Sequence, residues 1–284
     1  MGTLTSLARI GVNAVKHALG RGPEAEVSLR WLLRTTRVLN SRFRARAEVS
    51  CRLEGDYKIF TVNDQVFVWP KAAPLEGLIQ VCSEQMTQNH PHQYLWGPTQ
   101  LQPGEVALDI GACEGAFAAQ AAALGARVIA IEPSQIMITA MVRLFQLRGL
   151  APIHISRCLL GRSGSAFFLE RRDGPHASGT VDGPQDGAFE VPALTLDEYA
   201  EGIGLQRLDF IKCDAEGADV GIIKSGPATL RRFRPKLAIA TYHNDQDFLE
   251  LRQFLVPLGY KVRGKGLLTH SRTKLRVAML HAWC

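Results

Sequence analysis

Short apolar runs alternate with helix-like segments along most of the chain. From residue 103 the sequence repeatedly changes from an apolar run, through a turn, to a segment with helical spacing. The runs that predict strands are 106–111, 127–133, 153–160, 166–169, 208–214 and 236–242. The segments that predict helices are 114–124, 135–148, 194–201, 220–233 and 247–258. This alternation is typical of an α/β protein whose mostly parallel sheet is covered by helices on both faces.

Two further segments complete this main domain, which we place at residues 101–284. A closing pair of apolar runs, 261–268 and 275–281, predicts a hairpin that gives the sheet a C-terminal antiparallel strand. Residues 171–190 are polar and rich in glycine and proline, so they predict a loop.

The residues before the main domain follow another pattern. Residues 57–61 and 66–69 alternate as strands do, and Asn63 with Asp64 supplies turn chemistry between them. A helix is predicted from residue 75, before an irregular stretch at 89–96 that could border the functional pocket. We therefore expect residues 51–100 to form a small β-hairpin and helix extension on the substrate side.

Composition narrows the class of protein. The 284 residues are 46% hydrophobic and 21% charged, which is typical of a soluble globular protein with a sizeable core. The sequence contains no uninterrupted run of 18 apolar residues, so it predicts no membrane-spanning helix. Six cysteines without a Cys-x-x-Cys pair predict reduced thiols, no zinc site and a cytoplasmic location.

The net charge of +6 comes from residues 1–50. They contain nine lysines and arginines against Glu24, Glu26 and Glu48. This basic segment is predicted to be helical, with Gly20, Gly22 and Pro23 dividing it. It could form amphipathic helices that pack on the main domain, or it could contact a membrane surface or another anionic partner.

The first motif with chemical content follows the strand at 106–111. The strand leads into a turn with Gly111 and Gly115, and a helix begins there. Glycines allow close approach of a ligand to the backbone, and the helix start presents unpaired N–H groups. Glu132 ends the next strand, 21 residues after Gly111, where an acidic residue can hold ribose hydroxyls. The pattern indicates a nucleotide-containing ligand.

The turn distinguishes two classes of cofactor. Dinucleotide sites use Gly-x-Gly-x-x-Gly, but this turn reads Asp-x-Gly-x-x-x-Gly, with Asp109 before it and Glu114 inside it. Two carboxylates would repel a pyrophosphate, and they suit a cationic amino group such as that of S-adenosylmethionine. A tight turn that binds no ligand is the remaining alternative.

Charged residues also follow two later strands. Lys212, Asp214 and Glu216 alternate and therefore project to one side of an extended segment, and His243 follows the next strand. Because these strands end at the same sheet edge, the groups could orient a substrate, abstract a proton or bind a metal. The alternative is an internal lysine–carboxylate cluster that holds a loop.

The chain resembles the FkbM family of methyltransferases over about residues 100–268. The resemblance rests on Leu-Asp-Ile-Gly-Ala at 108–112, Ile-Glu-Pro at 131–133, Thr-Leu-Asp at 195–197, Ile-Lys-Cys-Asp-Ala-Glu-Gly-Ala at 211–218 and Tyr-His-Asn at 242–244. It implies a class I methyltransferase (Rossmann-like) fold with a seven-stranded sheet. It also implies methyl transfer from S-adenosyl-L-methionine, usually to a hydroxyl of a sugar or natural product.

The resemblance also implies roles for individual residues. The methionine end of the cofactor would lie beside Asp109, Gly111, Ala112, Cys113 and Gly115. The ribose would lie beside Glu132 and Pro133, and the adenine beside Cys158. Asp214 and Glu216 would face the transferred methyl group. The family usually has Asn where Cys113 stands and an apolar residue where Glu114 stands.

For the reaction we expect His243 to act as the base, with Asp214 orienting it or the substrate and with Glu216 and Lys212 in the same catalytic set. In a less favoured variant, Asp214, Glu216 and His243 bind a divalent metal that acidifies the hydroxyl.

Two other functions compete with a small-molecule O-methyltransferase. A nucleic-acid methyltransferase would use the basic N-terminal segment as an arm, but the main domain is neutral and the Asn/Asp-Pro-Pro-Tyr motif is absent. A non-catalytic adaptor would keep the fold without the reaction. The acceptor and the oligomeric state do not follow from the sequence.

Overall fold

The computed structural model describes residue 31 and residues 36–171, 178–269 and 275–284. Most of the predicted basic segment, residues 1–35, therefore lies outside the described residues, apart from Trp31. The rest of that segment contains helix α2 (Thr36–Arg44) and the start of the first strand, β1 (Val49–Glu54).

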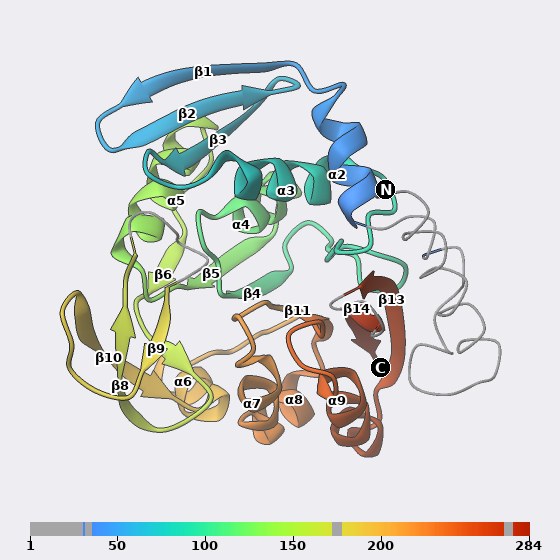
Figure 1. Cartoon of the computed structure of the whole chain (residues 1–284). Coiled ribbons are helices and arrows are strands. Elements are labelled where there is room, and N and C mark those ends of the chain that lie inside the picture. Colours follow the sequence, from blue (N-terminus) through green and yellow to red (C-terminus); the bar gives the residue numbers. More distant parts are fainter. Residues whose placement is uncertain (1–30, 32–35, 172–177, 270–274) are drawn as a thin grey trace.

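A seven-stranded sheet forms the centre of the molecule (Figure 1). Its order is β13 (Lys261–Thr269), β14 (Leu275–Trp283), β12 (Lys236–Ala240), β11 (Phe210–Cys213), β4 (Val106–Ile110), β5 (Arg127–Ile131) and β6 (His154–Ser156). Strand β14 pairs antiparallel with both β12 and β13, whereas the β12, β11, β4, β5 and β6 pairings are parallel. The prediction of a mostly parallel sheet with one C-terminal antiparallel strand is confirmed.

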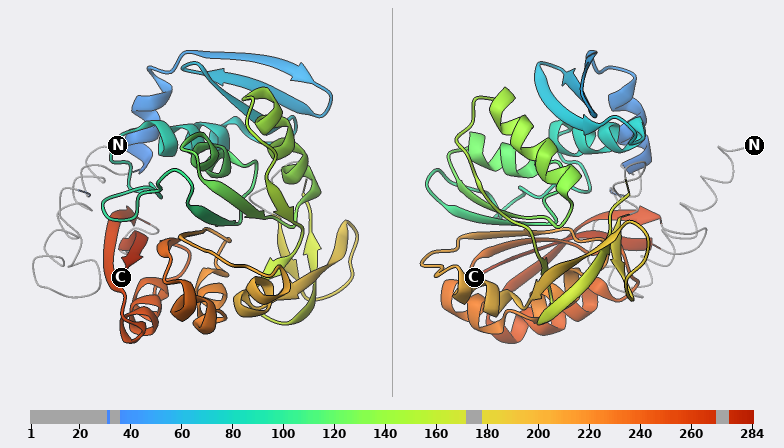
Figure 2. Two further views of the ribbon diagram at one scale, coloured as in Figure 1. Left: turned by 180° about the vertical axis from the view of Figure 1, so that it is seen from behind. Right: turned by 90° about the vertical axis from the view of Figure 1, so that its left-hand side faces the viewer.

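Helices cover both faces of this sheet (Figures 1 and 2). One face packs against α4 (Ala116–Ala123) and α5 (Gln135–Leu147), and the other packs against α6 (Leu196–Gly202), α7 (Asp219–Lys224), α8 (Pro227–Phe233) and α9 (Asp247–Leu255) with its 3-10 turn η4 (Val256–Leu258). The alternation of side chains along each strand explains the two layers. In β4, Ala107 packs toward α4, and Leu108 and Ile110 pack toward α7–α9.

The predicted helix over residues 220–233 is two helices. Pro227 stands at the first position of α8, where its missing N–H is not needed. The preceding Gly226 packs so closely on Leu196 that a Cβ would lie 2.4 Å from Leu196 Cδ2. The chain therefore turns between α7 and α8 instead of continuing as one helix.

The extension before the main domain is a three-stranded sheet with two helices. Strands β2 (Tyr57–Val62) and β3 (Gln65–Pro70) form the predicted hairpin, with Asn63 and Asp64 at φ of 44° and 66° in its turn. Strand β1, which the sequence did not predict, pairs with β2. One face of this sheet packs against α5, and the other packs against α2 and α3 (Leu75–Met86).

A second small sheet takes in two parts of the loop predicted at 171–190, namely residues 179–181 and 188–190, whereas residues 172–177 lie outside the described part of the chain. Strands β7 (Leu159–Leu160), β10 (Ala188–Leu194), β8 (Gly164–Leu169) and β9 (Gly179–Val181) pair in that order. The prediction of one strand over 153–160 is also wrong, because β6 and β7 belong to different sheets. Strand β9 is short and partly exposed, and the exposed residues Glu190 and Pro192 interrupt the apolar residues of β10, so neither strand has the continuous apolar pattern of a buried strand.

None of the helices within the described residues is long and apolar enough to span a membrane.

Candidate active site

The turn after β4 is held by contacts within the protein. Gly111 has φ of +68°, and a Cβ there would lie 2.1 Å from the carbonyl oxygen of Asp214. Gly115 has φ of +83°, and a Cβ there would lie 2.3 Å from Met141 Cγ. Both glycines are therefore needed by the local backbone and packing. Of the two, only Gly111 also lines a cavity.

A buried ion pair lies beneath this turn. Lys212 Nζ is 3.0 Å from Asp109 Oδ1, and it also donates hydrogen bonds to the carbonyl oxygens of Ile110 and Gly111. Burial opposes the charge on Lys212, but the carboxylates of Asp109 and Asp214 raise its pKa well above the usual range. Burial raises the pKa of Asp109, and the charge of Lys212 opposes that rise. Lys212 therefore holds the turn through its ion pair and two hydrogen bonds, and its expected catalytic role stays a prediction.

The first of two cavities lies at the ends of β4, β5 and β11 and has a volume of about 410 Å³. Glu132, Pro133 and Cys158 line it, as the resemblance implied. The backbone N–H groups of Cys113 and Ser134 donate to Glu132 at 2.8 and 2.9 Å. Burial raises the pKa of Glu132 to about 7. The second small sheet closes the far side with Phe168 and residues 178–180.

The second cavity, of about 480 Å³, lies between the turn and the N-terminal extension. Ala112, Cys113, Glu114 and Phe117 line it from the main domain. The opposite wall is formed by one face of α3 and by three residues of the predicted irregular stretch, His92, Gln93 and Tyr94. The expectation that residues 89–96 border the pocket is confirmed at these three positions.

The two cavities meet at four shared residues, Gly111, Cys113, Asp214 and Glu216. Asp109, Gly115 and His243 line neither cavity. Glu114 is buried, and its Oε2 atom has no hydrogen-bond partner among the described residues. Burial raises the pKa of Glu114 to about 7. A buried carboxylate oxygen that lacks a partner is a suitable acceptor for a cationic ligand group.

Asp214 is the centre of a buried polar cluster at this junction. Tyr94 and Tyr242 donate to its two oxygens at 2.7 and 3.4 Å. His92 Nε2 lies 3.3 Å from Asp214 Oδ2, and His92 Nδ1 lies 2.8 Å from Glu84 Oε1. Burial opposes ionisation of Asp214, but hydrogen bonding and positive charge from His92 hold its pKa well below the usual range.

Sequence reasoning missed His92, Tyr94 and Glu84 as members of this cluster. They come from α3 and from the segment after it, and no strand end places them at the sheet edge. The Asn-His-Pro-His stretch at 89–92 was the available signal, because it places two histidines in an irregular segment.

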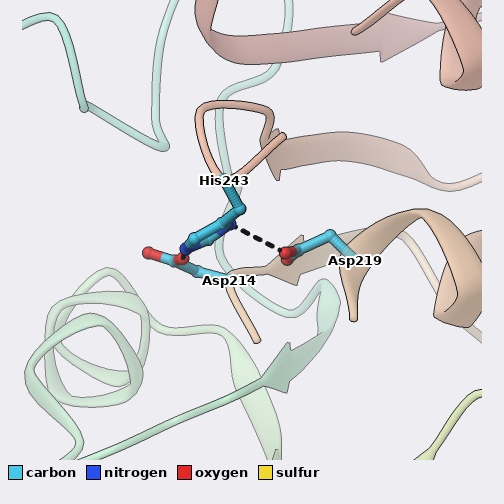
Figure 3. A group of neighbouring side chains, drawn as sticks. All are labelled: Asp214, Asp219 and His243. Atoms are coloured by element: carbon cyan, nitrogen blue, oxygen red, sulfur yellow. Dashed lines mark ion pairs between the residues drawn. The ribbon is translucent and has the colours of Figure 1, made fainter. Parts of the chain in front are cut away.

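His243 lies next to Asp214 and Asp219 (Figure 3), and it is not among the residues that line either cavity. Its Nδ1 atom is 3.1 Å from Asp219 Oδ2, and its Nε2 atom is 3.7 Å from Asp214 Oδ1 and 3.6 Å from Glu216 Oε2. Burial lowers its pKa, but these carboxylates outweigh burial and raise it to about 10. A protonated imidazole cannot accept a proton, so this arrangement argues against His243 as the base.

Asp214, Asp219 and His243 are close enough to hold one metal ion, with the potential ligand atoms within 4.8 Å of one another. This set contains Asp219 in place of the expected Glu216. Asp219 already accepts hydrogen bonds from the backbone N–H groups of Ala215 and Gly217. The donor set of oxygen and nitrogen atoms fits several divalent ions.

Comparison with solved structures gives distant similarities. Methyltransferase FkbM from Methylobacillus flagellatus KT aligns at 19% identity over 73% of this chain and 54% of that chain, with a TM-score of 0.49. Precorrin-6y C5,15-methyltransferase from Geobacter metallireducens GS-15 aligns at 14% identity over 64% of this chain and 81% of that chain, with a TM-score of 0.40. Magnesium protoporphyrin IX methyltransferase from Synechocystis PCC 6803 with bound SAM aligns at 13% identity over 64% and 70%, with a TM-score of 0.38.

The chain spans about half the length of the first of these structures. No curated protein matches the chain.

A family model described as the methyltransferase FkbM domain matches residues 109–262. The matched segment begins in β4, includes the turn, Glu132, Asp214 and His243, and ends in β13. Because this match covers more than half of the sequence, the chain belongs to the FkbM methyltransferase family.

Proposed function

We propose that the protein transfers a methyl group from S-adenosyl-L-methionine to a hydroxyl group of a small molecule, such as a sugar or natural product. The observation that carries this proposal is the pair of cavities that meet at Asp214, with Glu132 in the wall of one of them. One cavity would hold the adenosine of the cofactor. The other would hold the methionine end and the acceptor.

The residues present fit this cofactor. Glu132 lies where two ribose hydroxyls would donate to a carboxylate, beside the apolar side chains of Ile131, Met137 and Leu160. At the other end, the unpaired Oε2 atom of Glu114 would accept a hydrogen bond from the amino group of the cofactor. When bound, the cofactor supplies a methyl group on a positively charged sulfur.

The chain itself would position the acceptor. Asp214 borders both cavities, so a hydroxyl beside it would lie near the end of the donor site. The hydrogen bonds from Tyr94 and Tyr242 fix the carboxylate, and His92 keeps it ionised. Correct placement of the two reactants supplies a large part of the rate in a transfer between bound groups.

Calorimetric titration with S-adenosylhomocysteine tests the proposal. We expect micromolar binding to the wild-type protein. A correctly folded protein that shows no binding would contradict the proposal and favour a non-catalytic adaptor.

The affinity for S-adenosylhomocysteine should rise with pH. Burial raises the pKa of Glu114 to about 7, so this group is mostly protonated at pH 6 in the free protein. The ligand ammonium favours the carboxylate, so binding below the pKa releases a proton and becomes weaker as the pH falls. From about pH 6 to about pH 8, we expect about a 10-fold gain in affinity from this one group.

Calorimetry in buffers of different ionisation enthalpy measures this proton release. The variant Glu114→Gln should lose the part of the pH dependence that comes from Glu114. We assign any pH dependence that remains to Glu132, whose pKa is also raised to about 7. An unchanged pH profile in Glu114→Gln would show that the amino group does not bind beside Glu114.

Removal of divalent metal should not weaken cofactor binding. A metal ion at Asp214, Asp219 and His243 must displace the imidazole proton, and the surrounding carboxylates raise the pKa of His243 to about 10. Metal binding at neutral pH must therefore release this proton, which lowers the apparent affinity for the metal. We expect dialysis against a chelator to change the Kd of S-adenosylhomocysteine by less than about twofold. A larger loss of affinity that is reversed by adding Mg²⁺ or Mn²⁺ would contradict this expectation.

A further inference from the structure

We propose that the acceptor carries no phosphate, sulfate or carboxylate group, because the acceptor-side cavity is built to exclude anions. This proposal rests on the proposed function and narrows its substrate class. It assigns the selection to Glu76 and Glu84 of α3, which precede the family-matched segment (residues 109–262), together with Glu114, Asp214 and Glu216 within that segment.

The wall that faces the acceptor comes from one side of helix α3. Its lining residues recur with helical spacing and are Glu76, Gly77, Gln80, Val81, Glu84 and Gln85. Gln93, which follows α3, and Gln120 of α4 add two more side-chain amides. Amides can donate to and accept from hydroxyl or amino groups, but they bring no positive charge to neutralise an anion.

Negative groups outnumber positive groups around this cavity. The described residues that line it include the carboxylates of Glu76, Glu84, Glu114, Asp214 and Glu216. Lys212 and His92 are the only cationic side chains among those described lining residues. Lys212 is paired with Asp109 and the turn carbonyls, and His92 lies between Glu84 and Asp214. Neither cation is free to bind an anionic group of the acceptor.

The methyl donor does not reverse this balance. It would bring one net positive charge, from its sulfonium, because the ammonium and carboxylate of its amino-acid part cancel. Five carboxylates face two cations in the cavity wall, so the excess stays negative when the donor is bound, even if Glu114 is protonated. Charges of one sign that line a cleft with low-dielectric walls reinforce one another, so an anionic acceptor is repelled.

Cys113 provides a test that needs no identified acceptor. Its thiol is half-buried at the junction of the two cavities. In a background of Cys51→Ser and Cys284→Ser, which removes the two exposed cysteines, Cys113 can be modified with methanethiosulfonates of similar size. The reagents carry either an ethyltrimethylammonium or an ethylsulfonate group, and peptide mass spectrometry locates the adduct.

We expect the cationic reagent to modify Cys113 at least about 10 times faster than the anionic reagent at low salt, after each rate is divided by that of a small free thiol. The ratio should fall as salt is added, and S-adenosylhomocysteine should protect the thiol. Equal rates, or a faster anionic reagent, would overturn the proposal and would restore nucleic acid and phosphorylated compounds as acceptors.

Charge variants locate the source of the selectivity. Gln80→Lys with Gln85→Lys should lower the cation-to-anion rate ratio at least about 5-fold, because both side chains line the cavity. A matched control, Gln102→Lys with Gln206→Lys, adds the same two positive charges at exposed positions before β4 and β11, on the opposite edge of the sheet, and should leave the ratio unchanged. An equal effect of the control would show that net charge, and not the α3 wall, sets the ratio.

The outcome separates this proposal from the proposed function. If S-adenosylhomocysteine binds but the rate ratio is absent, the methyltransferase proposal stands and the acceptor selectivity is wrong. If the ratio is present but S-adenosylhomocysteine does not bind, the cavity excludes anions but does not serve a methyltransferase. Both results are obtained on the full chain.

Discussion

Replacing Glu132 with alanine should weaken S-adenosylhomocysteine binding by about 100-fold or more. In the proposed binding mode its carboxylate accepts hydrogen bonds from two ribose hydroxyls, and hydrogen bonds to a charged group each contribute about 1.5–3 kcal/mol. The same carboxylate accepts the backbone N–H groups of Cys113 and Ser134, so the substitution also releases the turn that lines both cavities. Both effects reduce affinity, and calorimetry of the folded variant measures their sum.

Glu170→Ala is the matched control for this variant. Glu170 lies near Glu132 and accepts hydrogen bonds from Ser134 Oγ and the backbone N–H of Ile136, but it lines neither cavity. Glu170→Ala removes both of these bonds, so it should disturb the start of α5 without a comparable loss of affinity. Equal losses in the two variants would mean that Glu132 acts through local folding and does not bind the ribose.

Lys212→Met should lower the free energy of unfolding by about 3–5 kcal/mol. The substitution leaves Asp109 as a fully buried carboxylate without its ion-pair partner, and breaking one side of a buried pair is strongly destabilising. It also removes the donor to the carbonyl oxygens of Ile110 and Gly111. Urea denaturation measures the change as a lower midpoint with an unchanged slope.

The double variant Asp109→Asn with Lys212→Met provides the comparison. It removes the uncompensated charge, so it should recover a large part of the lost stability even though it removes both charges of the ion pair. If the double variant is as unstable as Lys212→Met, the loss comes from packing or from the two carbonyl oxygens and not from the buried charge.

The middle of the central sheet could be predicted because β4, β11 and β12 are buried on both faces. Mostly apolar runs such as 106–111 and 236–242 are distinct in sequence from the helices between them. Of the second small sheet, only β8 coincides with a predicted strand, because β9 is short and partly exposed and Glu190 and Pro192 interrupt the apolar residues of β10. Strand β1 is exposed along most of its length and likewise lacks a buried pattern.

The site was predictable to the extent that parallel strands fix it. Glu132 and Asp214 follow β5 and β11, and strands of one parallel sheet bring their carboxyl ends to one edge. The charge states of Lys212 and His243 depend on partners in other elements, namely Asp109 in β4 and Asp219 in α7. A strand pattern carries no information on such partners, so the sequence could predict the positions of both residues but not their charge states, and their catalytic roles stay predictions.

The origin of the α3 wall has a consequence for how this enzyme could change its specificity. Gly111, Glu132 and Asp214, which we propose line the donor site, lie within the matched segment, and helix α3, which we propose faces the acceptor, precedes it. Substitutions in residues 76–85 can therefore alter acceptor choice while the donor cavity of about 410 Å³ keeps all of its lining residues. Exchanging α3 between related chains should therefore transfer acceptor preference. The exchanged helix must keep the contact that Glu84 makes with His92, because His92 also contacts Asp214.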